Sequence, residues 1–213
     1  MFIGHWAPAL LAAPRKDAPS LPVLFIAAQL VDWAFFGFLA LGVEHMRLIP
    51  GFTATNPMDL YHMPYTHSLL ASAIWAAAFA FIIFAATRNR MAALIGGFVV
   101  LSHWLLDLLV HVPDLTLAGG EPRIGLGLWN HPAIEMPLEI AITFGALAYY
   151  AHKRRPRTLP LVVLGAILLL LQGINWFGPV ESQVTLSTTL LAFFAYGLAT
   201  LASWWLWRSE RAR

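Results

Sequence analysis

Apolar residues run along the chain in long stretches, and short segments between these stretches hold most of the polar positions. A helix that crosses the hydrocarbon core of a bilayer needs roughly 20 predominantly apolar residues. The pattern therefore predicts six membrane-spanning helices, over about 21–43, 66–86, 91–111, 132–152, 159–177 and 187–207. No internal repeat and no long linker divides them, so we expect residues 1–213 to form a single all-α membrane domain, a helical bundle.

The first 20 residues do not follow this pattern. The segment MFIGHWAPALLAA lacks the basic start of a signal peptide, and Pro8 interrupts an apolar run that is already too short to span. We expect residues 1–20 to form an arm that is retained in the mature protein. This arm would lie at the membrane interface or turn back into the bundle as a re-entrant segment.

Composition agrees with a membrane protein. Hydrophobic residues make up 59% of the chain and charged residues 11%, against roughly 25% charged in a soluble domain. The isoelectric point near 9.2 would suggest a nucleic-acid partner for a soluble protein, but here we expect none because the basic residues have another explanation. The chain has no cysteine, which excludes disulfides and thiolate metal sites.

The basic residues are predicted to gather at one end of the bundle. Short loops rich in Lys and Arg stay in the cytoplasm, so we expect this end and both termini to be cytoplasmic. The opposite, outer end holds only Arg47 and Arg123. Eleven of the thirteen basic residues fall at the cytoplasmic end: Arg15, Lys16, Arg88, Arg90, Lys153, Arg154, Arg155, Arg157, Arg208, Arg211 and Arg213.

Acidic residues and histidines show the opposite bias. Nine of the eleven carboxylates and six of the eight histidines lie within predicted spans or toward the outer end. An ionisable side chain in the middle of a span costs about 2.5–3.5 kcal/mol on insertion scales. Several such groups in one bundle must therefore compensate one another, and a bound metal ion would compensate several at once. The deepest are Asp32, His103, Asp107, Glu135 and Glu139.

The outer connections 44–65 and 112–131 are the longest loops. In the first, Asn56 as N-cap, Pro57 at the first helical position and Asp59 predict the start of a short helix. Pro64 would end this helix before Thr66 caps the second span. The last two spans, 159–177 and 187–207, are nearly free of ionisable groups, so we interpret them as packing helices that face lipid.

Three segments place metal-ligand side chains at helical spacing. In SHWLLDLLVH, His103, Asp107 and His111 stand four residues apart and share one helix face. NHPAIEMPLE repeats this interval at the start of the fourth span, and HMPYTHS precedes the second span. Together the three segments supply these candidate ligands and catalytic groups: His103, Asp107, His111, His131, Glu135, Glu139, His62, His67 and Ser68.

Imidazole and carboxylate are ligands that suit zinc. A set of both would hold an ion whose bound water has a pKa near 7, inside an apolar site. Each piece also has a simpler interpretation. His103 and Asp107 alone could form a buried ion pair, paired histidines could ligate haem if carboxylates were not beside them, and His45 or His152 could be exposed or hydrogen-bond between helices. The other outer carboxylates are interpreted as solvated loop charges: Asp114, Glu121 and Glu181.

Four motifs resemble the YdjM-like, LexA-regulated inner-membrane proteins, which are described as metal-dependent hydrolases. The motifs are GHW at 4–6, Asp32 in QLVDW, HMPYTHSLL at 62–70 and LSHWLLDLL at 101–109. The family pattern has His-Arg-Gly-x-Thr-His-Ser, whereas this chain has Met63 and Pro64 in place of Arg-Gly, and a single acid, Asp32, where the family tends to have a pair. The resemblance covers roughly residues 4–110 and implies a multi-pass protein of the bacterial inner membrane.

A more distant likeness is to the zinc-dependent phospholipase C and P1 nuclease group, helical enzymes that hydrolyse phosphodiesters with a cluster of zinc ions. This likeness implies a divalent metal, most simply one to three zinc ions, and attack of water on a phosphoester. The predicted orientation puts His5 at the cytoplasmic side, so it reaches the site only if the arm turns inward. The shared order of ligands falls on His5, Asp32, His67, His103, Asp107, His111, His131 and Glu135.

We therefore predict a membrane-embedded hydrolase whose primary metal ligands are His67, His103, Asp107 and Asp32. His131 and Glu135 would bind a second metal, or Glu135 would be the general base. A site toward the outer leaflet suits a lipid or lipid-linked substrate, with membrane lipids as partners. The alternative is a transporter that uses the same groups as an ion or proton site, although interrupted helices in two matching halves are not evident. A non-catalytic scaffold would leave the buried charges unexplained.

Overall fold

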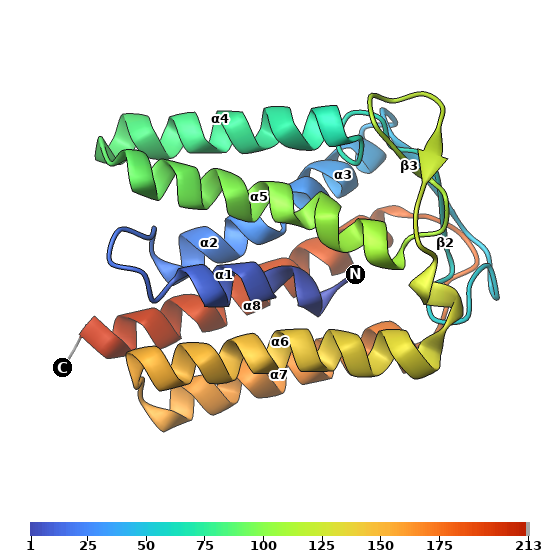
Figure 1. Cartoon of the computed structure of the whole chain (residues 1–213). Helices are drawn as coiled ribbons and strands as arrows, with labels where there is room; N and C mark the ends of the chain where they lie inside the picture. The colour runs from blue at the N-terminus through green and yellow to red at the C-terminus, as the bar shows by residue number, and fades with distance from the viewer. Residues whose placement is uncertain (212–213) are drawn as a thin grey trace.

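The computed structural model describes residues 1–211, and most of them are helical. The helices pack side by side into a bundle whose long connections, with two small hairpins, gather at one end (Figure 1). The helices are η1 (Ile3–Trp6), α1 (Ala7–Ala12), α2 (Leu21–Ala28), α3 (Leu30–Ala40), α4 (Leu69–Thr87), α5 (Arg90–Val110), η2 (Leu128–Asn130), α6 (Pro132–Arg154), α7 (Thr158–Phe177) and α8 (Leu186–Arg211). The strands are β1 (His45–Leu48), β2 (Met58–His62), β3 (Leu115–Thr116) and β4 (Arg123–Ile124).

Helices lie over all six predicted ranges, but they differ in how well they suit a membrane. Within residues 1–211, four helices are long and apolar enough to cross one: α4, α5, α7 and α8. A fifth span would need α2 and α3 together, and their axes bend by 52°. The 23-residue α6 is long enough but is more polar, with Glu135 and Glu139 in its first half. The predicted all-α bundle is confirmed, with four helices that meet the requirement.

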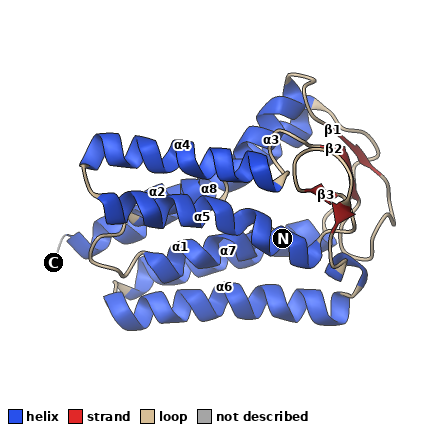
Figure 2. Cartoon of the chain, turned by 45° about the horizontal axis from the view of Figure 1, so that its top comes forward, coloured by secondary structure: helices blue, strands red, loops and turns tan. Residues whose placement is uncertain are grey.

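The two ends of the bundle separate the charges as the sequence pattern predicts. The turns between α4 and α5 and between α6 and α7 lie at the same end as the loop after α1 and the end of α8 (Figure 1). Arg47 and Arg123 lie on the hairpins at the opposite end (Figure 2), and Arg213 falls outside the described residues. Met1 itself lies inside the bundle rather than at the basic end, because the arm turns inward, whereas α8 ends at the basic end.

The N-terminal arm is re-entrant. It runs from the basic end back into the bundle, where η1 and α1 lie between α5 and α6 (Figure 1). The side chains of Ile3, Trp6 and Leu10 are fully buried there. Apolar burial of this kind contributes roughly 25 cal/mol per Å² removed from a polar environment. Here it holds in place a segment that is too short to cross a membrane by itself.

Buried polar groups fix the first residues of the arm. Glu139 of α6 accepts the backbone N–H groups of Phe2 at 2.6 Å and Gly4 at 3.0 Å through Oε1. Gln172 of α7 donates to the other oxygen of Glu139 at 3.0 Å. Gln29, at the break between α2 and α3, donates its side-chain amide to the carbonyl of Phe2 at 3.3 Å. Side chains of α6, α7 and the break between α2 and α3 therefore fix the first residues of the arm.

α4 and α5 form a close antiparallel hairpin. A Cβ atom at Gly97 would lie 3.0 Å from the carbonyl oxygen of Ala76 and 3.1 Å from the Cβ of Ala80. Small residues at such a contact let two helix backbones approach each other closely. The hairpin places the start of α4, and with it His67, beside the second half of α5.

The outer connections differ from the prediction in one element. Residues Met58–His62 form β2, which pairs with β1 in an antiparallel hairpin, so the predicted short helix is wrong. Asn56 does not cap a helix, because its Oδ1 accepts the N–H of Met58 at 2.8 Å in a local turn. Asn side chains compete for nearby backbone groups in this way, and the same residue therefore suits both turns and caps.

Candidate metal centre

Ionisable side chains from four segments meet in the interior of the bundle. All are buried except the carboxylate of Asp32, which is 15% exposed. The arm contributes one histidine, the bent α2–α3 pair an aspartate, the segment before α4 a histidine, and α5 with its end the remaining three groups. The cluster consists of His5, Asp32, His67, His103, Asp107 and His111.

Asp107 lies at the centre of this cluster. Its Oδ1 is 3.0 Å from Nε2 of His5 and 3.4 Å from Nε2 of His111, and the amino nitrogen of Met1 is 2.7 Å away. Its Oδ2 faces the other way, 3.1 Å from Nε2 of His103 and 3.8 Å from Nε2 of His67. The two oxygens of one carboxylate thus face two different groups of ligands.

Asp32 completes the second of these groups. Its Oδ1 lies 3.4 Å from Nε2 of His67 and 3.4 Å from Nε2 of His103. Two sets of three residues bring their donor atoms within 4.8 Å of one another, and either set could hold a metal ion. One set is His5, His103 and Asp107, and the other is Asp32, His67 and His103.

Three of the histidines are held in one orientation by an oxygen atom at Nδ1. A backbone carbonyl or an ionised carboxylate can only accept, so an Nδ1 atom bound to it bears the proton. In the neutral ring the lone pair is then on Nε2, the atom that faces the centre. The contacts are His103 with the carbonyl of Ala28 at 2.9 Å, His111 with Asp114 at 2.9 Å, and His67 with the hydroxyl of Thr66 at 2.8 Å.

The break in the first predicted span provides one of these oxygens. α2 ends at Ala28, and the last carbonyls of a helix lack a partner within the helix. The carbonyl of Ala28 is therefore free to bind His103. The bend also turns Asp32, near the start of α3, toward the cluster. In a straight helix over 21–43 the carbonyl of Ala28 would accept the N–H of Asp32 and would not be free for His103.

Nε2 of His103 and Oδ2 of Asp107 are both buried without a hydrogen-bond partner, although they lie 3.1 Å apart. A proton on Nε2 would make an imidazolium, but the ring of His5 stacks on that of His103 with centroids 3.7 Å apart. Protonation of both stacked rings would place two positive charges face to face in a medium of low dielectric constant, so at most one of the two is an imidazolium. A divalent cation between neutral imidazoles and carboxylates satisfies all these atoms, so the donor set fits a metal.

A three-residue chain of hydrogen bonds supports His67. Thr66 donates its hydroxyl to Oε2 of Glu44 at 2.6 Å, which leaves the hydroxyl oxygen to accept from Nδ1 of His67. Glu44 is fully buried, and its Oε1 also accepts the backbone N–H groups of Tyr65 at 2.8 Å and Thr66 at 3.0 Å. Such outer partners orient a ligating imidazole and raise its basicity.

Sequence reasoning missed three of the supporting residues. Asp114, interpreted as a solvated charge, is buried against His111, and its position three residues later was a readable signal. Tyr196 of α8 donates its hydroxyl to Oδ2 of Asp32 at 3.3 Å, so the last predicted span does more than face lipid. Nothing local in the sequence indicated Tyr196 or the bond from Glu44 to Thr66.

Two predicted ligands lie away from the cluster. His62 is exposed on β2, where its ring stacks on His45 with centroids 5.5 Å apart. His131 is exposed at the residue before α6, with φ of −126° and ψ of 68°. The structure thus gives neither of them a contact with Asp107, in contrast to His111, which completes the spacing on α5.

The other three candidates have distinct local roles. Ser68 caps α4, accepting from the N–H of Ala71 at 3.1 Å and donating to the carbonyl of Pro64 at 2.8 Å. Glu139 holds the arm, as described above. Glu135 is buried, lines the cavity beside the cluster, and leaves its Oε2 without a hydrogen-bond partner among residues 1–211.

A cavity of about 270 Å³ adjoins the cluster. Asp32, His67, Asp107 and His111 form its polar wall together with Glu135 and Glu139, and side chains of α3, α7 and α8 form an apolar wall. Lys and Arg are absent from the residues that line it. The cluster therefore faces a space that could admit part of a ligand, and this space is rich in carboxylates.

Comparisons with known proteins assign neither a family nor a function to the chain. No family model matches the chain, and neither a curated protein nor a solved structure is significantly similar to it. The resemblance to YdjM-like membrane proteins and to zinc-dependent phospholipases therefore stays a prediction from motifs. The structure contributes the convergence of those motifs: residues far apart in the chain, such as His5, Asp32 and Asp107, meet at one buried point.

Proposed function

We propose that the chain is a membrane-embedded, metal-dependent hydrolase that cleaves a phosphoester or other ester bond of a lipid or lipid-linked substrate. One observation supports this above the others: the Nε2 atoms of four histidines face the oxygens of a central aspartate in a buried cluster beside a cavity. Buried polar atoms are normally paired, so such a set of facing acceptors favours a bound cation.

His67, His103 and Asp32 would hold the metal together with Oδ2 of Asp107. Imidazole nitrogens combined with carboxylate oxygens suit zinc, with bonds of roughly 2.0–2.2 Å. A second ion would be held by His5 and His111, which lie on the Oδ1 side of Asp107. A zinc ion there would supply Lewis acidity and lower the pKa of bound water to about 7.

Glu135 is the proposed general base. A base must lie in the reaction space with a free acceptor atom. The buried Glu135 lines the cavity and has an unpaired Oε2, whereas Glu139 uses both of its oxygens to hold the arm and Gln172. Glu135 would take a proton from the attacking water, and the apolar walls of α7 and α8 would keep bulk water from the site.

We further propose that the chain spans the bacterial inner membrane six times, with α2–α3 as the first span and α6 as the fourth. The gathering of Arg and Lys at one end of the bundle would place that end in the cytoplasm. The cluster lies in the half of the bundle nearer the hairpins, so the active site would open toward the outer leaflet. A membrane lipid reaches this depth without leaving the bilayer.

One observation supports the competing proposal, an ion or proton site in a transporter. The α2–α3 pair is bent by 52° next to Asp32, and interrupted helices form ion sites in many transporters. Transport predicts ion flux into vesicles without chemical change of any lipid. A metal ion that stays bound through purification, and hydrolysis of a lipid, would instead favour the hydrolase.

The proposal is tested by the metal content of protein purified in detergent without added metal, measured by inductively coupled plasma mass spectrometry. We expect roughly one to three zinc ions per chain, with loss in a His103→Ala/Asp107→Ala variant. A His45→Ala/His62→Ala variant, which removes the exposed pair, is the matched control and should keep its metal. Wild-type protein that is folded by circular dichroism, binds no added zinc and cleaves no phospholipid would refute the proposal.

A further inference from the structure

The cavity beside the cluster is closed at the outer end of the bundle. Thr55 binds Trp129 across this end, with its backbone N–H 3.0 Å and its hydroxyl 3.2 Å from the Trp129 carbonyl. Asn56 and Leu60, which line the cavity from the same connection, are buried, as is Trp129. Two outer connections therefore form a packed cover over this end of the cavity, and a small separate pocket of about 40 Å³ beside this cover reaches His67 from the hairpins.

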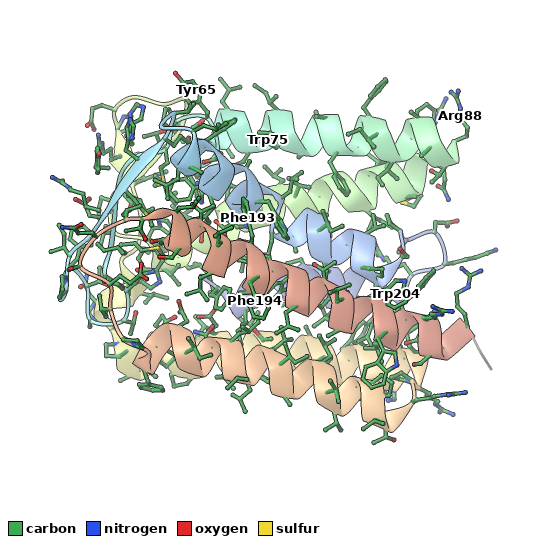
Figure 3. The ribbon with its side chains drawn as sticks, turned by 180° about the vertical axis from the view of Figure 1, so that it is seen from behind. Tyr65, Trp75, Arg88, Phe193, Phe194 and Trp204 are labelled. Atoms are coloured by element: carbon green, nitrogen blue, oxygen red, sulfur yellow. The ribbon has the colours of Figure 1, made fainter. Side chains whose placement is uncertain are left out.

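The same cavity has an exposed apolar rim between α7 and α8. Ile174 of α7 is 51% exposed, and Leu191 and Phe194 of α8 are 59% and 64% exposed, yet all three line the cavity. A residue that lines a cavity and is also more than half exposed lies at its opening. Figure 3 shows Phe194 on the side of α8 that faces α7. Its neighbour Phe193 lies on the opposite side and stacks on Trp33 at 5.0 Å.

The rim lies at the depth of acyl chains. α7 and α8 are both apolar enough to cross a membrane. Leu191 is five residues from the start of α8 and Tyr196 is ten, which corresponds to about 8 and 15 Å along the helix at 1.5 Å per residue. Half of a typical hydrocarbon core is about 15 Å. The opening thus runs through one leaflet, down to the level of Asp32 and Tyr196.

The size and charge of the cavity restrict what can occupy it. About 270 Å³ is below the roughly 300–1,000 Å³ of pockets that enclose a whole drug-sized ligand, so a lipid could place only its head inside. Four lining carboxylates, those of Asp32, Asp107, Glu135 and Glu139, would repel a phosphate unless metal ions offset their charge. Binding of an anionic head should therefore depend on the metal.

We propose that the rim between α7 and α8 is the lateral route by which a phospholipid of the bilayer reaches the metal centre. The phosphate head enters the cavity, and the acyl tail stays in the membrane against Ile174, Leu191 and Phe194. Contact between the acyl tail and these three side chains then selects a substrate that has an acyl tail. This inference rests on the proposed function for its metal centre, but it concerns α7 and α8, outside the segment of motif resemblance.

The test is photo-crosslinking in vesicles of phosphatidylcholine. The zinc-loaded protein is reconstituted with rising amounts of a phosphatidic acid that bears a diazirine on one acyl chain, and labelled peptides are identified by mass spectrometry. As the amount of diazirine lipid rises, we expect labelling of residues 171–177 and 188–196 to reach a plateau. Labelling of the exposed apolar face of α4 should instead rise in proportion to the amount of this lipid. Removal of zinc with a chelator should lower the rim labelling at least fivefold, or about 1 kcal/mol. Rim labelling that rises linearly like that of α4 would overturn the route.

A pair of variants tests the position of the route. Leu191→Trp fills the opening from an exposed position, and Leu190→Trp places the same side chain on the neighbouring residue, which is 57% exposed and does not line the cavity. We expect the Leu191→Trp protein to keep its zinc. Its saturable labelling should fall at least fivefold and its rate of phospholipid hydrolysis at least tenfold, whereas both should be unchanged in the Leu190→Trp protein. Equal labelling in both variants would overturn the inference.

The outcomes separate this inference from the proposed function. If wild-type protein cleaves phospholipid and Leu191→Trp cleaves it at the same rate, the route is wrong and the hydrolase stands. If wild-type protein binds zinc and shows saturable rim labelling but cleaves no lipid, the hydrolase is wrong and the route stands as a lipid-binding site.

Discussion

Thr66→Val removes one hydroxyl group and leaves the shape of the side chain almost unchanged. In the wild-type protein this hydroxyl donates to Glu44 at 2.6 Å and accepts from Nδ1 of His67. The variant therefore breaks both contacts of the chain that orients His67. It leaves every proposed metal ligand in place. It therefore tests directly whether the residues that orient His67, namely Thr66 and Glu44, support metal binding.

The structure sets the expected size of the effect. Glu44 keeps its two backbone donors at 2.8 and 3.0 Å, so only one of its oxygens loses a partner. Nδ1 of His67 loses its acceptor in a fully packed site. A buried polar group left unpaired costs about 1–3 kcal/mol, and loss of a group that orients a metal-bound histidine typically lowers metal affinity 10–100-fold. We expect a loss of roughly 1–3 kcal/mol in stability and of at least tenfold in zinc affinity.

Zinc affinity is measured by competition with a chelating indicator, and the fold is followed by thermal unfolding in circular dichroism. Thr143→Val is the matched control, because the hydroxyl of Thr143 is buried without a hydrogen-bond partner among the described residues. Its removal leaves no partner unpaired, so both zinc affinity and stability should stay near wild type. A Thr66→Val protein that is folded and binds zinc within twofold of wild type would show that the hydrogen-bond chain has no role in metal binding.

Two further variants test other contacts of the site. Tyr196→Phe removes the hydrogen bond to Asp32, and since one such bond contributes about 0.5–1.5 kcal/mol, the free energy of unfolding should fall by about this amount and zinc affinity roughly two- to tenfold; unchanged affinity would contradict the role of Tyr196. Glu139→Leu removes both acceptor oxygens and leaves the N–H groups of Phe2 and Gly4 unpaired, so the arm should be released and limited proteolysis within residues 1–20 should quicken, whereas an arm as protected as in wild type would argue against this role of Glu139.

Much of the architecture follows from patterns that are local in the sequence. The length of the apolar runs predicts the helices, because a helix of fixed rise must match a bilayer of fixed thickness. The spacing of four residues predicts that His103 and His111 share a face with Asp107, and both contact it. These inferences need no knowledge of which helices are neighbours in space.

The same rule fails where the backbone is not helical. His131 and Glu135 also stand four residues apart, but His131 precedes α6 and has non-helical dihedral angles, so its side chain is exposed while Glu135 is buried. His62 lies on a strand and is likewise outside the cluster. At the ends of a helix the spacing alone does not decide the outcome: His111, directly after α5, contacts Asp107, whereas His131, directly before α6, lies outside the cluster.

Contacts between distant segments could not be predicted either. The hydrogen bond from Tyr196 to Asp32 joins residues that are 164 positions apart, and the bond from Thr66 to Glu44 crosses a hairpin that the sequence pattern assigned to a short helix. A tyrosine in an apolar run has many possible neighbours, and its burial beside a carboxylate depends on how α8 packs on α3. The inward path of the arm was left open for the same reason.

The buried arm has a consequence for the order of events during synthesis. Residues 2–5 emerge from the ribosome early, yet their hydrogen bonds and their contact with the cluster require Asp107 and Glu139, made more than 100 residues later. Chains are made and begin to fold from the N-terminal side, so this segment must wait, outside its final position, until α6 has been added. The arm is thus made before α5 and α6 but placed after them, and the complete cluster can assemble only in a nearly finished bundle.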